Sequence, residues 1–278
     1  MSPRPRIALA TLLVLLLAGA AAAQFGRGFF RTPPRQPNAE SFGKGFNFCR
    51  GVYTSGRREP GGQGWSTDYP DAERNFSIRL AELTRTRISR VAGTGEDYGE
   101  PDYLTIRLQD PALLQCPYLH MEDVGTAAFT DLEIEGLRTY LLKGGFLWVD
   151  DFWGSFAWEN WERQIGRVLP PTDFPIRDVP LDHPIYRTHF EVKELPQIPS
   201  IQFWRTSGGG TSERGIDSAE PRMRAIFDER GTIMVLMTHN TDISDAWERE
   251  GEDPRFFYNF SPDGYAVGIN VIIYALTH

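Results

Sequence analysis

The chain has 278 residues, and its 37 acidic side chains outnumber the 29 basic ones, which gives a formal net charge of −8. Such an acidic balance argues against nucleic acid and against anionic membrane surfaces as partners. The length is enough for one large α/β domain or two small ones, and we expect one, over residues 42–278.

Two segments precede this domain. Arg4 and Arg6 stand before a long apolar run, and a series of alanines follows it, ending at Ala23. This pattern is typical of a cleaved secretory signal peptide over residues 1–23. Residues 24–41 are rich in Pro, Gly and Arg, which predicts a flexible tether. We therefore expect an exported protein, periplasmic or extracellular, with no integral membrane segment after signal cleavage.

The chain has two cysteines, Cys49 and Cys116. In an oxidising compartment such a pair can form a disulfide if the fold brings the two residues together. The pair has no C-x-x-C spacing, so it does not predict a zinc site.

The first part of the domain alternates strands with helices. Aromatic and β-branched residues predict the strands, and apolar residues at helical spacing predict the helices. Thr130 and Glu133 form the sequence signature of a capping box at the start of one helix. The predicted elements are, in order, a strand over 46–53, a helix over 70–89, strands over 102–108 and 118–123, a helix over 130–143, a strand over 146–151 and a helix from about 155 to 169. This alternation is typical of a parallel sheet with helices on both faces.

The pattern changes after Pro171 to loops and shorter strands, one of which is predicted at IQFW, residues 201–204. Residues 223–240 predict a β-hairpin that turns around Glu229, Arg230 and Gly231. The apolar spacing of residues 264–278 predicts a closing helix.

Several segments carry a resemblance to a known family. The segments GWSTDYP, YLHMEDVG, GGFLWVDD and DHPIYR, in this order, resemble a bacterial domain-of-unknown-function family with a class I glutamine amidotransferase-like fold. The resemblance implies a flavodoxin-like parallel sheet flanked by helices. Amidotransferases of this fold place a nucleophilic cysteine in a sharp strand-to-helix turn. The corresponding turn here is Asp150-Asp151-Phe152, so the resemblance implies no glutamine hydrolysis by that route.

Polar side chains follow several predicted strands, at the edge where an open parallel sheet binds its ligands. If these strands are neighbours, one edge gathers Arg50, Glu122, Asp123, Asp150, Asp151, His239 and Asp242. The carboxylates could hold a hard cation, or one aspartate could activate water as a general base. Trp65 and Trp153 lie in loops and suit stacking against a sugar ring.

Each of these residues also has an ordinary structural interpretation. Asp150 or Asp151 could cap the helix that begins near Ser155. Glu122 and Asp123 could be the solvated end of a strand. Other polar residues have similar alternatives: Asp68 and Asp71 favour the positive end of the following helix, and His239 could be a surface or packing histidine.

Three functions from different classes remain open. The first is an exported, non-catalytic module that binds a ligand or an envelope protein, which the missing nucleophile favours. The second is a carboxylate- or metal-dependent hydrolase acting on a carbohydrate or envelope substrate. The third is a structural component of an envelope assembly. No organic cofactor is predicted, whereas a divalent cation is possible.

Overall fold

The computed structural model describes residues 33–278 apart from Glu96, so the predicted signal peptide and the first part of the tether lie outside the described residues. One compact unit spans Arg35–His278. Its first residues lie along the strand β2 (Tyr103–Arg107), where the amide of Thr105 donates to the carbonyl of Arg35 at 2.9 Å. The Arg35 guanidinium lies 4.3 Å from the centre of the Tyr103 ring. The domain therefore begins before Phe42, inside the segment predicted as a tether.

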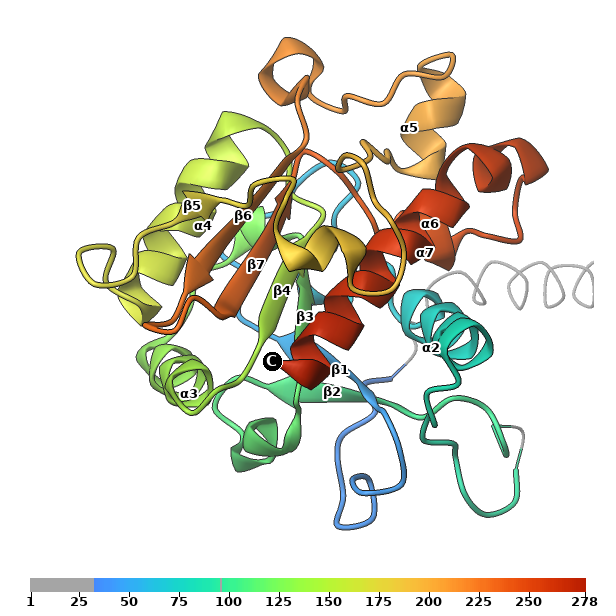
Figure 1. Ribbon diagram of the computed structural model, residues 1–278, viewed down its shortest axis with the longest axis vertical. Helices are drawn as coiled ribbons and strands as arrows, with labels where there is room; N and C mark the ends of the chain where they lie inside the picture. Colours follow the sequence, from blue (N-terminus) through green and yellow to red (C-terminus); the bar gives the residue numbers. More distant parts are fainter. Residues whose placement is uncertain (1–32, 96) are drawn as a thin grey trace, which may run out of the picture. The chain divides into compact units, whose positions relative to one another are not determined.

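A seven-stranded, mostly parallel sheet forms the middle of this mixed α/β domain. Its strand order is β2-β1-β3-β4-β7-β6-β5, which can be followed in Figure 1. Strands β2, β1, β3, β4 and β7 are parallel, and β6 and β5 are antiparallel additions at one edge. The other strands are β1 (Phe48–Val52), β3 (Leu119–Glu122), β4 (Leu147–Asp150), β5 (Arg177–Asp178), β6 (Arg222–Phe227) and β7 (Ile233–His239).

The chain reverses its direction of travel across the sheet at β1. From β1 it moves to β2 on one side, and it then crosses to β3 on the other side of β1. In an open α/β sheet, such a reversal leaves a crevice outside the carboxyl ends of the two strands that flank it. The topology therefore predicts a ligand site at the carboxyl ends of β1 and β3.

In the described part of the chain, six helices pack against the sheet. They are α2 (Asp71–Thr84), α3 (Asp131–Leu142), α4 (Gly154–Val168), α5 (Ile201–Thr206), α6 (Asp245–Glu248) and α7 (Pro254–Thr277). Because strand side chains alternate between faces, Trp148 packs with α2, α6 and α7, whereas Leu147 and Val149 pack with α3 and α4. Short 3₁₀ segments complete the chain: η1 (Gly64–Ser66), η2 (Pro111–Gln115), η3 (Val124–Thr126), η4 (Pro184–Arg187) and η5 (Gly215–Ser218).

Local signals explain where several of these helices begin and end. The capping box at the start of α3 is present. The side chain of Thr130 accepts from the amide of Glu133, and the side chain of Glu133 accepts from the amide of Thr130. Helix α2 ends at Thr84, earlier than predicted, because Arg85 adopts a left-handed conformation with φ of 63°. The predicted strand IQFW is wrong, since residues 201–206 form α5.

Among the described residues, no helix combines the length and the apolar character needed to cross a bilayer.

Cys49 on β1 and Cys116 after η2 form a disulfide, with the two Cα atoms 6.2 Å apart and the residues separated by 67 positions in sequence. Closing a loop of this length restricts the unfolded chain. Replacing both cysteines by alanine is expected to lower the free energy of unfolding by about 2 to 4 kcal/mol. Urea denaturation of the two proteins measures the difference, and equal stabilities would contradict the expectation.

Candidate functional site

A row of polar side chains crosses one face of the sheet beneath α2 and α6. In the strand register, Arg50 of β1 lies opposite His120 of β3, and Glu122 lies opposite Asp150 of β4. The row continues to Thr238 of β7, whose hydroxyl donates to Asp150 at 2.5 Å. All five residues are 0% exposed, so this is a polar layer within a packed core.

Three further carboxylates complete what we call the acidic cluster. Asp242 and Asp245 follow β7, and Asp68 precedes α2. Carboxylate oxygens of Glu122, Asp150 and Asp242 lie within 4.8 Å of one another, and so do oxygens of Asp68, Asp242 and Asp245. Asp242 belongs to both triads. The acidic cluster is therefore made of Asp68, Glu122, Asp150, Asp242 and Asp245.

Backbone amides satisfy part of the acidic cluster. Asp150 accepts from the amide of Ser244 at 3.1 Å, and Asp242 accepts from the amide of Asp245 at 2.8 Å. Two oxygens are buried and have no hydrogen-bond partner, Oδ2 of Asp68 and Oε2 of Glu122. Since buried polar atoms in native proteins are almost always bonded, these two oxygens call for a partner.

Burial and mutual repulsion make the ionised form of the acidic cluster unfavourable. Burial raises the pKa of Asp68, Asp150, Asp242 and Asp245 well above the usual range, and neighbouring carboxylates raise it further in each case. Two guanidinium groups lie nearby. The buried Arg50 is bound to Glu73 and lies 3.4 Å from Glu122, and the half-buried Arg249 is bound to Glu248 and lies 3.9 Å from Asp245. Because each of them is also paired with a carboxylate outside the cluster, they cannot balance the charge of the whole cluster when it is ionised.

Glu122 is the member that stays ionised most readily. Burial raises its pKa. The electrostatic attraction and hydrogen bond of His120, together with the charge of Arg50, outweigh burial and lower the pKa below its ordinary value. Glu122 therefore supplies a carboxylate to the middle of the acidic cluster.

The contacts of His120 do not form a nucleophilic triad. Its Nε2 atom contacts both Glu122 and, at 3.1 Å, the hydroxyl of Ser244, while its Nδ1 atom is buried without a partner. A working triad uses one ring nitrogen for the nucleophile and the other for the acid. The arrangement therefore does not prepare Ser244 as a nucleophile.

Asp123 and Asp151 directly follow β3 and β4, and both have positive φ, 50° and 51°. Asp123 accepts from the amide of Gly64 at 2.7 Å, and burial raises its pKa to about 7. Asp151 accepts from the indole of Trp153 at 2.9 Å. Both aspartates adjoin the acidic cluster, but Asp123 is bonded to the loop before α2 and Asp151 to a residue of its own loop. Because Glu122 and Asp123 are 0% and 2% exposed, their interpretation as a solvated strand end is wrong.

The start of α4 is capped by other residues, so the capping interpretation of Asp150 and Asp151 is also wrong. Asn240 accepts from the amide of Gly154 at 2.8 Å, and Asp217 accepts from the amide of Ser155 at 2.9 Å. Both acceptors come from segments much later in the chain.

Besides Arg50, Asp123 and Asp151, which adjoin the acidic cluster, three more predicted site residues lie outside it. His239 points to the opposite face from Thr238, and its Nε2 atom contacts the carbonyl of Gly154 at 3.0 Å. Trp153 is only 4% exposed, so it does not offer a ring face to a sugar. Trp65 is half-buried, with its ring centre 5.6 Å from that of Tyr69.

Sequence reasoning missed two members of the acidic cluster, Asp68 and Asp245. The sequence predicts Asp68 at the positive end of α2, yet Pro70 holds the N-cap position there, without a side-chain capping bond. The D-x-x-D spacing of Asp242 and Asp245 was an available signal. His120 was also missed, although a residue two positions before Glu122 in a strand must share its face.

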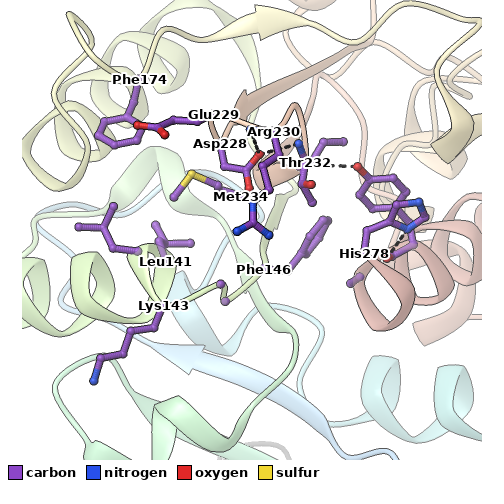
Figure 2. Close-up of a pocket in the computed structure, with 16 residues that line it drawn as sticks. Leu141, Lys143, Phe146, Phe174, Asp228, Glu229, Arg230, Thr232, Met234 and His278 are labelled. Carbon is purple, nitrogen blue, oxygen red and sulfur yellow. Dashed lines mark hydrogen bonds between the residues drawn. The ribbon is translucent and has the colours of Figure 1, made fainter.

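A depression lies at the opposite edge of the sheet, where β4 and β7 begin. Figure 2 shows this pocket, which is lined by the end of α3, the β6–β7 turn and the end of α7. Its volume is about 530 Å³. The side chain of Asp228 forms its hydrogen bonds within the turn, where it accepts from the amides of Arg230 and Thr232. None of the described lining residues has a buried polar side-chain atom without a partner. The acidic cluster is therefore the stronger candidate site.

The fold and the site together define a mixed α/β domain with a group of carboxylates, four of them buried and Asp68 half-buried, at the carboxyl edge of its parallel strands. The family model described as "Domain of unknown function (DUF4159)" matches residues 54–276, and the chain belongs to this family. No curated protein matches the chain.

Proposed function

We propose that this chain is an exported, flavodoxin-like domain that binds a divalent cation in its acidic cluster and uses it to hold an oxygen-rich ligand of the cell envelope. The observation that carries the proposal is the triad of Glu122, Asp150 and Asp242. Their oxygens lie within 4.8 Å of one another, and the three residues are 0 to 2% exposed. Such a group is stabilised by a cation that compensates its charge.

The donor atoms indicate the kind of cation. Both triads offer carboxylate oxygens, with no thiolate or imidazole among their members. Hard cations such as Mg²⁺ and Ca²⁺ prefer oxygen ligands, whereas zinc and copper favour nitrogen and sulfur. The proposed cation is therefore Mg²⁺ or Ca²⁺.

Other features support the remaining parts of the proposal. The order β2-β1-β3-β4-β7 supports a flavodoxin-like assignment, because it repeats the 2-1-3-4-5 order of that fold. The disulfide between Cys49 and Cys116 supports an oxidising compartment. With both cysteines so engaged and no cysteine or serine in the turn after β4, the proposed role is binding rather than amidotransferase chemistry.

Thermal unfolding tests the cation site. In wild-type protein freed of metal by a chelator, adding Mg²⁺ or Ca²⁺ at 100 times its dissociation constant should raise stability by about 2.7 kcal/mol. For a domain of this size the midpoint should rise by roughly 5 to 10 °C. In the Asp150→Asn variant the rise should be smaller or absent, because one charged ligand is lost.

The matched control is Asp131→Asn, since the Asp131 side chain is 99% exposed in the first turn of α3. This variant should keep the full rise. An unchanged wild-type midpoint with both cations would reject the proposal, as would equal rises in Asp150→Asn and wild type.

A further inference from the structure

We infer that the acidic cluster holds two divalent cations rather than one, with Asp242 as a ligand shared between them. The inference rests on the proposed cation site and deepens it. The first cation is assigned to Glu122, Asp150 and Asp242, and the second to Asp68, Asp242 and Asp245.

The two triads have separate supports in the fold. Glu122 and Asp150 are held by neighbouring strands in register, whereas Asp245 is held by α5, accepting from the amide of Ile201 at 2.8 Å. Asp242 stands between these supports because it follows β7 directly and accepts from the amide of Asp245. A carboxylate has two oxygens with several lone pairs, so Asp242 can serve both positions.

Each triad also contains one unsatisfied oxygen. Oε2 of Glu122 belongs to a side chain that is 0% exposed, and its other oxygen is engaged by His120 and Arg50. Oδ2 of Asp68 is the buried, unpartnered atom of the second triad. A single cation bound by the first triad would leave the Asp68 oxygen without a partner.

Charge leads to the same number of cations. The five carboxylates of the acidic cluster carry five negative charges when all are ionised. The two nearby arginines, Arg50 and Arg249, are also paired with carboxylates outside the cluster, Glu73 and Glu248. One divalent cation compensates two of these charges and two compensate four. Since unpaired charge is costly in a buried site, the second cation accounts for a group of this size.

Paired cations of this kind bind a ligand oxyanion between them, as in many phosphate-ester enzymes. The ligand class that follows is a phosphate or carboxylate group, held by both ions at once. The oxygen-rich envelope ligand of the proposed function should therefore carry such a phosphate or carboxylate group.

The test is the number of cations bound per chain, measured by equilibrium dialysis of the full chain against Ca²⁺ or Mg²⁺ followed by elemental analysis. Wild type should bind two. Asp150→Asn should lose the first and keep one, while Asp68→Asn should lose the second and keep one. Asp242→Asn should lose both.

The control for Asp68→Asn is Asp71→Asn, because Asp71 is nearby in sequence and its side chain is 57% exposed. The Asp71→Asn variant should bind two cations. The thermal midpoint in chelator shows whether each variant folds, and asparagine keeps an acceptor oxygen at every position.

One cation in wild type, lost in Asp150→Asn and kept in Asp68→Asn, would overturn the two-cation inference and leave the proposed function standing. No bound cation in wild type would overturn both.

Inorganic phosphate tests the ligand class. With both cations present, phosphate should raise the midpoint of wild type, and the rise should vanish in Asp68→Asn, which retains one cation. An equal rise in both proteins, or none in wild type, would overturn the assignment of an oxyanion bridging the two ions.

Discussion

Replacing Arg50 by methionine is expected to lower the free energy of unfolding by roughly 3 to 5 kcal/mol. Arg50 is 0% exposed and contacts Glu73, Glu122 and the carbonyl of Thr67. Removing its charge leaves two buried carboxylates, Glu122 of the acidic cluster and Glu73 beside it, without their nearest positive partner. Such an uncompensated charge is far more unfavourable than the loss of an exposed ion pair. Chemical denaturation of cation-free protein measures the loss.

Two further variants separate this effect from ordinary loss of packing. Arg74→Met removes an ion pair with Glu100 whose side chains are 43% and 42% exposed, and it should change stability by less than about 1 kcal/mol. Adding Glu73→Gln to Arg50→Met should recover part of the stability, because it removes one of the stranded charges. If Arg50→Met lowered the free energy of unfolding no more than Arg74→Met does, the buried ion pairs of Arg50 would not stabilise the fold.

Local patterns predicted the elements of the first half of the domain, because their signals are contained in short stretches of sequence. The capping box of Thr130 and Glu133 is one example, since both partners lie within one turn. Helix α5 shows the limit. Its aromatic and branched residues favour a strand, but Ser200 caps it locally and Asp245 accepts from the amide of Ile201. The second contact joins residues far apart in sequence, so no local pattern reveals it.

The candidate site was predictable to the extent that strand ends determine it. Glu122, Asp150 and Asp242 were expected at one edge of the sheet and lie together there. The sequence also predicts His239 at this site because it ends β7, but side chains alternate along a strand, so Thr238 faces the acidic cluster and His239 faces away from it. Asp68 could not be placed, since it reaches the acidic cluster from a loop whose path depends on tertiary packing.

The cation-free protein is expected to become less stable as the pH rises from about 5 to 8. A carboxyl group whose folded pKa is raised binds more protons in the folded state than in the unfolded state. Its ionisation therefore opposes folding over the interval between the unfolded and folded values. For Asp123 that interval runs from 3.8 to about 7, and each pKa unit is worth about 1.4 kcal/mol. The raised pKa values of Asp68, Asp150 and Asp242 act in the same direction.

Saturating Ca²⁺ or Mg²⁺ should reverse the sign of this dependence. Protons and cations compete for the same carboxylates, so cation binding tightens as the pH rises and stability in the presence of the cation should rise with it. Urea denaturation at pH 5 and 8, with chelator and with cation, gives the four values that are needed. In chelator, Asp123→Asn should make the free energy of unfolding depend less on pH, because it removes one titrating group. A stability in chelator that rises from pH 5 to pH 8 would contradict the raised pKa values, since groups that lose their proton more readily in the folded state, such as His239 with its pKa lowered by burial to about 4, would then dominate.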